Sequence, residues 1–312
     1  MKYDIISILD LKDEIFDLIN FSKKLKLGAL KDTFPLKGKT LAMIFEKSST
    51  RTRVSFEAGM AQLGGHALYL SPKELQMGRG EILSDTAKVL SRYVDCIMYR
   101  AFDHKMMVDL ANNSNVPVIN GLDNLEHPCQ AVADLMTIFE YKGKFKRIKV
   151  AYVGDGNNVC NSLMLGCAMV GIDFYSAHPR GFEPDKNLID KANQLAKINN
   201  CVSIHIEDPY EAVENADVIY TDTWVSMGME EQTNERLKIF EGYQVNSFLL
   251  KRAKKDCIVM HCLPAHRGQE ITDEVMDGPH SVVFDQAENR LHTEKAILLR
   301  VILRDEMTFM LK

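Results

Sequence analysis

Two consecutive series of short apolar segments alternate along this chain with longer amphipathic segments. The apolar segments have the length and residue types of buried strands, and the amphipathic ones carry apolar residues at helical spacing. Such alternation with short connections predicts parallel sheets flanked by helices, in which ligands bind beyond the carboxyl ends of the strands. We expect strands at 41–45, 67–70, 95–99 and 116–119 in the first series, and at 150–153, 174–175, 202–204, 218–220 and 258–260 in the second.

A chain of 312 residues is long enough for two domains with separate cores. The two series are separated by Gly143 and a basic cluster from Lys142 to Lys149, and we place the domain boundary there. The expected helices are 8–25, one that follows Ser49, 82–93, 106–111, one that ends at 141, 161–170, 187–198, 210–213 and 288–307. The predicted fold class is therefore α/β.

Charge and apolar patterning exclude several kinds of partner. The formal net charge is −5 and the basic residues are scattered, so nothing favours nucleic acid. No apolar run approaches the length of a membrane span, and the N-terminus lacks an export segment. The seven cysteines are an odd set without paired metal spacing, and most of them are expected to be buried. We therefore expect a cytoplasmic protein that binds neither nucleic acid nor membrane.

The turn from Ser49 to Arg53 follows the first predicted strand and begins a helix with Phe56, Met60 and Leu63 on one face. The first turn of a helix presents backbone N–H groups, its dipole favours negative charge, and arginine matches phosphate oxygens in a bidentate manner. These features predict a phosphate site. The alternative is that Ser49 or Thr50 only caps the helix and the arginines are solvated.

Arg100 and His127 follow predicted strands at the same edge of the first sheet. A histidine alone is more often structural than catalytic, but here an arginine and a phosphate site are expected at the same edge of the sheet. A His N–H and an Arg together could polarise a carbonyl near the bound phosphate, which is the arrangement that acyl transfer needs.

The loop from Gly154 to Asn158 superficially resembles the start of a dinucleotide fingerprint. The third glycine is missing at Val159, and no acidic residue ends the next strand at Ser176–His178, so the signal is weak. Asn158 could contact a small ligand at this switch-point loop, or the loop could merely be a tight turn.

Two further loops follow strands of the second series. Cys262, in the run from His261 to Pro264, could be a nucleophile, a metal ligand or a polar contact to substrate. The loop from Asp222 to Gly228 could hold a substrate amine through its aspartate and close over the site as a lid. An ordinary surface loop is the alternative.

Together these segments resemble the aspartate/ornithine carbamoyltransferase family over nearly the whole chain. The motif from Ser49 to Arg53, Arg100, and the His-Pro-x-Gln motif from His127 to Gln130 are family-wide. Cys129, the run from His261 to Pro264 and the Ser-Met-Gly end of the Asp222 loop resemble the ornithine-specific members. The resemblance implies two doubly wound domains, each with a parallel sheet flanked by helices, joined by interdomain helices. The first would span 1–141 plus 287–312 and the second 142–286, with the active site in the cleft between them.

The resemblance also implies the role of individual residues. Arg100, His127, Cys262 and Arg290 would be catalytic. Carbamoyl phosphate would be bound by Ser49, Thr50, Arg51, Thr52, Gln76, Arg100, His127, Gln130, Cys262, Leu263 and Arg290. Ornithine would be bound by Asn158, Asp222, Ser226 and Met227. Gln76 would reach a neighbouring site in a homotrimer, and neither a metal nor a cofactor would be needed.

The activity implied is transfer of the carbamoyl group of carbamoyl phosphate to the side-chain amine of L-ornithine, giving L-citrulline and phosphate, as in arginine biosynthesis. An amine of this kind has a pKa of about 10.4 and attacks only when neutral. The gathered arginines would disfavour its protonated form, and the departing phosphate could accept the proton. Another acceptor such as putrescine or aspartate, a nucleotide-binding oxidoreductase and a phosphometabolite-binding protein are the alternatives.

Overall fold

The computed structural model describes residues 2–71, 75–76, 80–225, 231 and 233–303. The chain divides into two compact units: residues 1–136 with 288–312, and residues 137–287. The division falls within two helices, α5 (Pro128–Lys142) and α12 (Val283–Ile302), so each of them begins in one unit and ends in the other. The boundaries expected at 141/142 and 286/287 lie a few residues from this division and remain a prediction.

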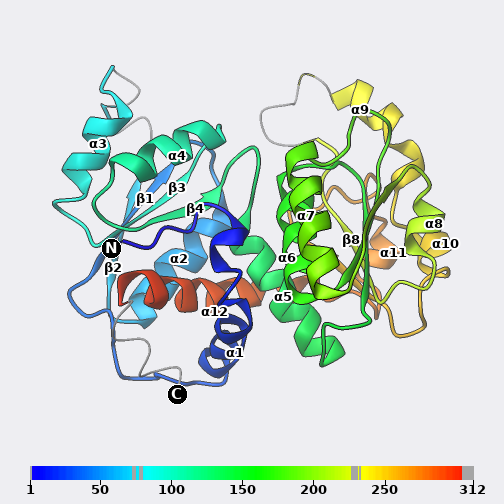
Figure 1. The fold of residues 1–312 in the computed structure, drawn as a ribbon, viewed down its shortest axis with the longest axis horizontal. Coiled ribbons are helices and arrows are strands. Elements are labelled where there is room, and N and C mark those ends of the chain that lie inside the picture. The colour runs from blue at the N-terminus through cyan, green and yellow to red at the C-terminus, as the bar shows by residue number, and fades with distance from the viewer. Residues whose placement is uncertain (1, 72–74, 77–79, 226–230, 232, 304–312) are drawn as a thin grey trace. The chain divides into compact units, whose positions relative to one another are not determined.

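The first unit contains a four-stranded parallel sheet of order β2-β1-β3-β4. Figure 1 shows α3 and α4 on one face of this sheet and α2 and α12 on the other. Strands β1, β3 and β4 are almost entirely buried, as expected of parallel strands covered on both faces. The elements are β1 (Thr40–Phe45), α2 (Thr50–Gln62), β2 (His66–Leu70), α3 (Leu83–Leu90), β3 (Cys96–Arg100), α4 (His104–Asn113) and β4 (Val118–Leu122).

The strand order puts a switch point between β1 and β3, at the carboxyl ends of these strands. The chain leaves β1 toward β2 on one side and then returns to place β3 on the other side of β1. Connections that depart in opposite directions leave a crevice beyond the carboxyl ends of the two strands. The Ser49 turn follows β1 and Arg100 ends β3, so both lie at this switch point.

The second unit contains a five-stranded parallel sheet of order β7-β6-β5-β8-β9. Helices α6 and α7 lie on one face, and α8 and α10 lie on the other (Figure 1). The strands are β5 (Lys149–Val153), β6 (Asp173–Ala177), β7 (Ser203–Ile206), β8 (Val218–Thr221) and β9 (Ile258–His261). The helices are α6 (Asn158–Val170), α7 (Lys186–Asn199), α8 (Pro209–Val213), α9 (Thr233–Ile239), η4 (Glu241–Tyr243), α10 (Ser247–Leu250) and α11 (Asp273–Met276).

Here the switch point lies between β5 and β8, because β6 and β8 flank β5 on opposite sides. The Gly154 loop follows β5 and Asp222 follows β8. The predicted fold class is confirmed, and in each unit the polar loops singled out in the sequence stand at the place where ligands of such sheets bind.

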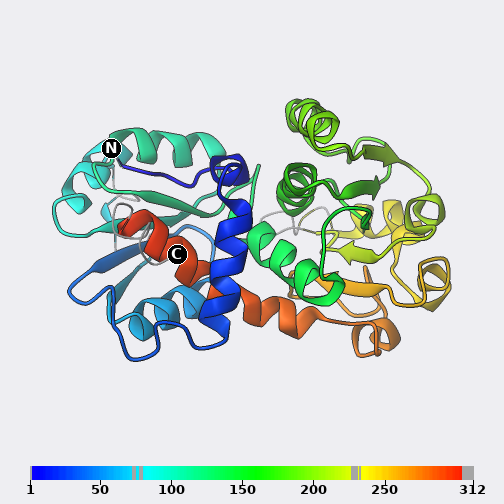
Figure 2. The same cartoon turned by 60° about the horizontal axis from the view of Figure 1, so that its bottom comes forward.

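The terminal helices differ from their predicted limits. The predicted helix at 8–25 is divided into a short 3₁₀ helix, η1 (Ile8–Leu11), and α1 (Ile15–Lys26). Ser7 and Asp10 form a capping box at the start of η1. Helix α12 begins five residues before the predicted start, and residues 304–307 of the prediction lie outside the described part. Helix α1 crosses the part of α12 that lies in the first unit (Figure 2), where Lys26 Nζ donates to Asn289 Oδ1 at 2.8 Å.

Candidate functional site

The predicted phosphate turn is the N-terminus of α2. Ser49 is its N-cap, and its Oγ accepts the N–H of Thr52 at 3.3 Å. The capping role considered from sequence is therefore real, but capping satisfies only one of the N–H groups that the first turn cannot bond internally. Arg51 lies in this turn and is partly exposed. The helix terminus thus offers amide donors, a dipole and a guanidinium to an anion.

Arg290, on α12, connects three parts of the first unit. Its side chain is buried, with Nη1 donating to Gln130 Oε1 at 2.8 Å and Nη2 to Thr52 Oγ1 at 3.0 Å. Nε donates at 2.8 Å to Glu294, one turn further along α12. Burial alone would lower the pKa of Arg290, but Glu294 together with Cys129 and Asp134 outweighs burial, and the pKa lies above its ordinary value. Arg290 is therefore a fixed positive charge beside the first turns of α2 and α5.

Arg100 and His127 are both buried. Arg100 ends β3, and His127 follows the turn after β4 and directly precedes α5. Burial holds the pKa of His127 well below its ordinary value of 6.5, and three nearby guanidinium groups lower it further. These groups belong to Arg290, Arg100 and Arg51. The predicted cluster is thus assembled in the structure, and His127 is a neutral imidazole that can donate an N–H or accept one near neutral pH.

The turn that precedes His127 was not recognised in the sequence. Asp123 Oδ1 accepts the N–H groups of Leu125 and Glu126, each at 2.8 Å, and Asp123 Oδ2 accepts from Asn120 at 2.8 Å. Glu126 Oε2 accepts the N–H of Ile8 at 3.0 Å. This network fixes the backbone that carries His127, and the Asp-Asn-Leu-Glu run is a turn signal that could have revealed it.

The low pKa of His127 predicts a pH dependence of stability. Below about pH 6.5 the unfolded chain takes up a proton that the folded chain cannot bind until lower pH, so stability falls as the pH falls, by at most about 1.4 kcal/mol per pH unit. Urea unfolding at pH 5.5 and 7.5 measures this loss. His127→Gln should lose less stability between the two pH values than the parent chain, and an equal loss in both proteins would contradict the assignment.

Three further residues of the first unit were singled out in the sequence, and the structure places each in a different environment. Gln130 is buried against Arg290, and its Nε2 donates to Asp134 Oδ1 at 2.8 Å. Gln76 is exposed in the segment between β2 and α3. Cys129 is fully buried with its thiol toward the carbonyl of Asn120, and burial raises the pKa of that thiol, so it packs as a small apolar residue.

In the second unit, Asp222 is the centre of a hydrogen-bonded group. Asn157 Nδ2 donates to Asp222 Oδ2 at 2.8 Å, and Cys262 Sγ donates to Asp222 Oδ1 at 2.9 Å. Asn157 is also the N-cap of α6, where its Oδ1 accepts the N–H groups of Val159 and Cys160. The sequence singled out Asn158, but Asn157 is the residue that contacts Asp222 and so orients its carboxylate.

A glycine explains why this loop resembles a dinucleotide motif without being one. A Cβ on Gly156 would lie 2.3 Å from the backbone nitrogen of Pro184, so the segment around Pro184 packs directly on the loop. The glycine is required by close packing within the protein.

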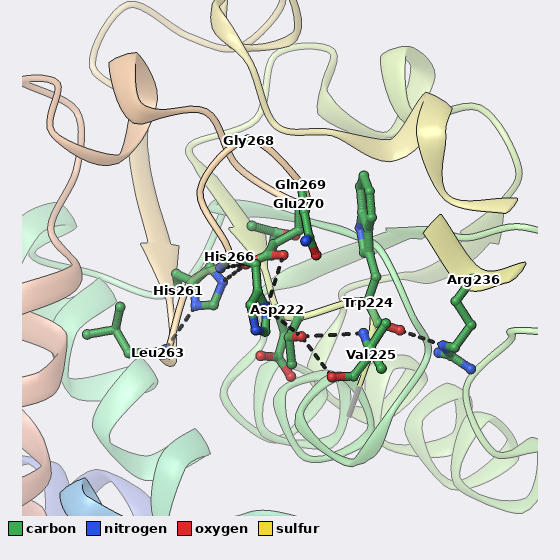
Figure 3. A network of polar contacts seen from close by, with 12 residues as sticks. Asp222, Trp224, Val225, Arg236, His261, Leu263, His266, Gly268, Gln269 and Glu270 are labelled. Atoms are coloured by element: carbon green, nitrogen blue, oxygen red, sulfur yellow. Dashed lines mark hydrogen bonds and ion pairs between the residues drawn. The ribbon is translucent and has the colours of Figure 1, made fainter. Parts of the chain in front are cut away.

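Asp155 and Arg236 form a second buried group beside Asp222. Arg236 is ion-paired with Asp155, donates from Nε to the carbonyl of Trp224 at 2.5 Å (Figure 3) and lies over the ring of Phe182. Burial raises the pKa of Asp155 to about 6 although Arg236 opposes the change, and the charge of Asp222 adds to the rise. When ionised, Asp155, Arg236 and Asp222 together carry a net negative charge, which suits a cationic ligand.

The remaining predictions concern the ends of these loops. Ser226 and Met227 lie outside the described residues. Leu263 follows Cys262 with a φ of 60°, in the left-handed region. Asp222, His261 and Cys262 offer three possible metal-ligating atoms within 4.8 Å of one another, but both ring nitrogens of His261 contact protein groups. That no metal is required remains a prediction.

Comparison with known families covers both units. Residues 3–140 match the family model described as the carbamoyl-P binding domain of aspartate/ornithine carbamoyltransferase, and residues 146–301 match the Asp/Orn binding domain. The chain belongs to the aspartate/ornithine carbamoyltransferase family. The resemblance inferred from the Ser49, His127 and His261 motifs is therefore confirmed.

Individual carbamoyltransferases are similar along nearly their whole length. The catabolic ornithine carbamoyltransferase of Thermoplasma volcanium is 54% identical over 96% of this chain and 99% of its own. The anabolic enzyme of Pyrococcus furiosus is 56% identical over 93% of both chains. A solved structure of ornithine carbamoyltransferase from P. furiosus gives a TM-score of 0.92 and 54% identity, covering 96% of this chain and 97% of that one.

Proposed function

We propose that this carbamoyltransferase moves the carbamoyl group of carbamoyl phosphate to the side-chain amine of L-ornithine, giving L-citrulline and phosphate. The observation that carries the proposal is the charge of the two switch points: cationic and rich in helix-terminal donors in the first unit, anionic in the second. Carbamoyl phosphate is an anion and the α-amino group of ornithine is a cation, so each switch point complements one substrate.

The first unit binds carbamoyl phosphate in this proposal. Its phosphate group lies at the N-terminus of α2, and its carbonyl is polarised by Arg100 and His127. A neutral His127 suits this role, because a neutral imidazole polarises a carbonyl as an N–H donor without adding another full charge to the arginine cluster. The residues proposed to bind it are Ser49, Thr50, Arg51, Thr52, Arg100, His127, Gln130 and Arg290, together with Cys262 and Leu263 of the second unit and Gln76.

The second unit binds ornithine. Asp222 provides the negative charge, and Asn157 and Cys262 hold its two oxygens in place. Asn158, Ser226 and Met227 complete the proposed set. Cys262 donates to Asp222 and orients polar groups. We assign it no covalent role, because a direct displacement needs no carbamoyl-enzyme.

The reaction proceeds by direct displacement. The neutral amine nitrogen forms a bond to the carbonyl carbon while the bond between that carbon and the phosphate oxygen breaks, and the bonding electrons leave with phosphate. The oxyanion that develops is stabilised by Arg100 and His127, and the departing phosphate accepts the proton of the attacking amine. No carbamoyl-enzyme is formed.

We propose the biosynthetic direction, toward arginine. It is supported by the chemistry of the donor, since an acyl phosphate transfers its group readily to an amine, and by the similarity to the anabolic enzyme of P. furiosus. A cytoplasmic location is supported by seven free cysteines, of which five are buried, as expected in a reducing compartment. In the part of the chain that is described, no helix has both the length and the apolarity that crossing a membrane requires.

A homotrimer is also proposed. Strand β2 is at the edge of the first sheet and carries an exposed Leu68, and Val54, Ile82 and Tyr93 on neighbouring elements are exposed as well. Exposed apolar side chains around an edge strand are typical of a subunit interface. The exposed Gln76 would then reach a neighbouring site. Sedimentation equilibrium should give three times the mass of one chain, and a monomer would refute this arrangement.

Offering different acceptors to the purified protein tests the function. Citrulline and phosphate should form from carbamoyl phosphate with ornithine, and putrescine, N-acetylornithine and aspartate should be poor acceptors. Preference for another amine would refute the assignment of Asp222. Saturable binding of carbamoyl phosphate without release of phosphate would show that the protein binds carbamoyl phosphate but does not transfer its carbamoyl group.

A further inference from the structure

His261 and Glu270 form a buried pair to which the proposed chemistry gives no role (Figure 3). Both side chains are fully buried, and His261 Nε2 lies 3.1 Å from Glu270 Oε1. The same oxygen also accepts the N–H of His266. Burying a carboxylate is costly unless several donors surround it. An apolar pair would fill this space more cheaply, so the pair needs an explanation other than packing.

Hydrogen bonding fixes the tautomer of His261. The N–H of Leu263 donates to His261 Nδ1 at 2.8 Å. A backbone amide can only donate, so Nδ1 carries no proton, and in the neutral ring the proton is on Nε2, which faces Glu270. Glu270 therefore selects the tautomer in which Nδ1 can accept from Leu263.

The backbone held in this way is unusual. Leu263 has a φ of 60°, a left-handed conformation that side chains other than glycine rarely adopt. Such a conformation persists where surrounding contacts determine it, and these positions concentrate at functional sites. Cys262, the preceding residue, places its sulfur 2.9 Å from Asp222 Oδ1. The conformation at Leu263 thus sets the direction of both residues relative to Asp222.

The same loop also contacts the segment after β8. His266 Nδ1 lies 3.1 Å from Thr223 Oγ1, and that hydroxyl donates to the carbonyl of Val225 at 3.0 Å. Glu270 binds the backbone of His266, so it connects the Leu263 turn with the Asp222 loop (Figure 3).

We propose that His261 is a positioning residue whose Nδ1 holds the Leu263 backbone, with Glu270 selecting the tautomer, so that Cys262 and Leu263 are presented to the substrates. This inference rests on the proposed function, in which those two residues contact substrate. His261 and Glu270 touch no substrate and act only through the residues they hold.

Two substitutions distinguish the roles of the two ring nitrogens of His261. In His261→Asn the amide oxygen lies near the place of Nδ1 and can accept from Leu263, but Glu270 loses its donor. In His261→Gln the amide nitrogen lies near the place of Nε2 and can donate to Glu270, but Leu263 loses its acceptor. We expect H261N to keep kcat/KM for ornithine within about tenfold and H261Q to lose about a hundredfold, in the range of other positioning partners.

Thermal stability should follow the opposite order, with H261N the less stable protein because it leaves a buried carboxylate without its donor. A purely structural pair predicts that activity follows stability, so higher activity in H261Q, or equal activity in the two variants, overturns the proposal. Glu270→Gln should stay near the parent activity, because its amide oxygen can still accept from Nε2.

A nitrogen NMR signal measures the tautomer without any assay. The ¹⁵N shift of His261 Nδ1 in the parent protein should be that of an unprotonated acceptor, and a protonated Nδ1 would overturn the inference even if activity behaved as expected. Absence of carbamoyl transfer in the parent chain would refute the proposed function instead, leaving the tautomer result to stand on its own.

Discussion

Replacing Arg51 by Met is expected to lower kcat/KM for carbamoyl phosphate about a thousandfold, since removing one preorganised charged donor costs roughly this much. Arg51 lies in the first turn of α2, where its guanidinium adds to the amide donors and the helix dipole. The side chain is partly exposed, so its loss should change stability little. Citrulline formation at varied carbamoyl phosphate and saturating ornithine measures the effect.

Arg53→Met is the matched control for this variant. Arg53 is on the same helix two residues later, but it is exposed, pairs with Glu57 at 3.0 Å and lies 3.9 Å from the centre of the Tyr69 ring. We expect this variant to keep its activity within about threefold, as surface substitutions usually do. If R53M lost as much activity as R51M, the effect could not be assigned to a specific contact of Arg51 with the phosphate.

The central strands of both sheets were predictable because they are almost fully buried and carry a local signal. The apolar runs that form β1, β3, β5 and β8 are uninterrupted, which is typical of parallel strands covered by helices on both faces. Strand order depends on pairings between distant segments, and no local pattern encodes it. The sequence could therefore place Asp222 at a strand end but could not show that β8 lies beside β5.

The hydrogen-bond partners of the site residues are of two kinds: some are close in sequence and could be predicted, and others are distant in sequence and could not. Glu294 is four residues from Arg290 on one helix, so a local rule could have paired them. Asn157 meets Asp222 across 65 residues and Asp155 meets Arg236 across 81, and only the folded sheet brings these groups together. That Asn158 contacts ornithine stays a prediction, and the role of Asn157 as the cap of α6 depends on where that helix begins.

Asp222→Asn is expected to lower kcat/KM for ornithine about a hundredfold and to leave the affinity for carbamoyl phosphate unchanged. The variant removes the negative charge that would face the α-amino group of ornithine. A hydrogen bond to a charged group contributes about 1.5–3 kcal/mol. The amide is nearly isosteric, and Asn157 can still reach its oxygen, so the loop should keep its conformation. Steady-state kinetics with ornithine and calorimetric titration with carbamoyl phosphate separate the two effects.

Cys262→Ser is the control that separates charge from covalent chemistry. A serine hydroxyl can donate to Asp222 Oδ1 as the thiol does, so direct displacement predicts a loss of less than about tenfold, since the donor to the carboxylate is kept. A nucleophilic thiol predicts near-complete loss in C262S and a trapped carbamoyl group on the parent Cys262. If D222N kept full activity with ornithine while C262S lost it, Asp222 would not recognise the α-amino group, and the net negative charge of Asp155, Arg236 and Asp222 would have no part in binding ornithine.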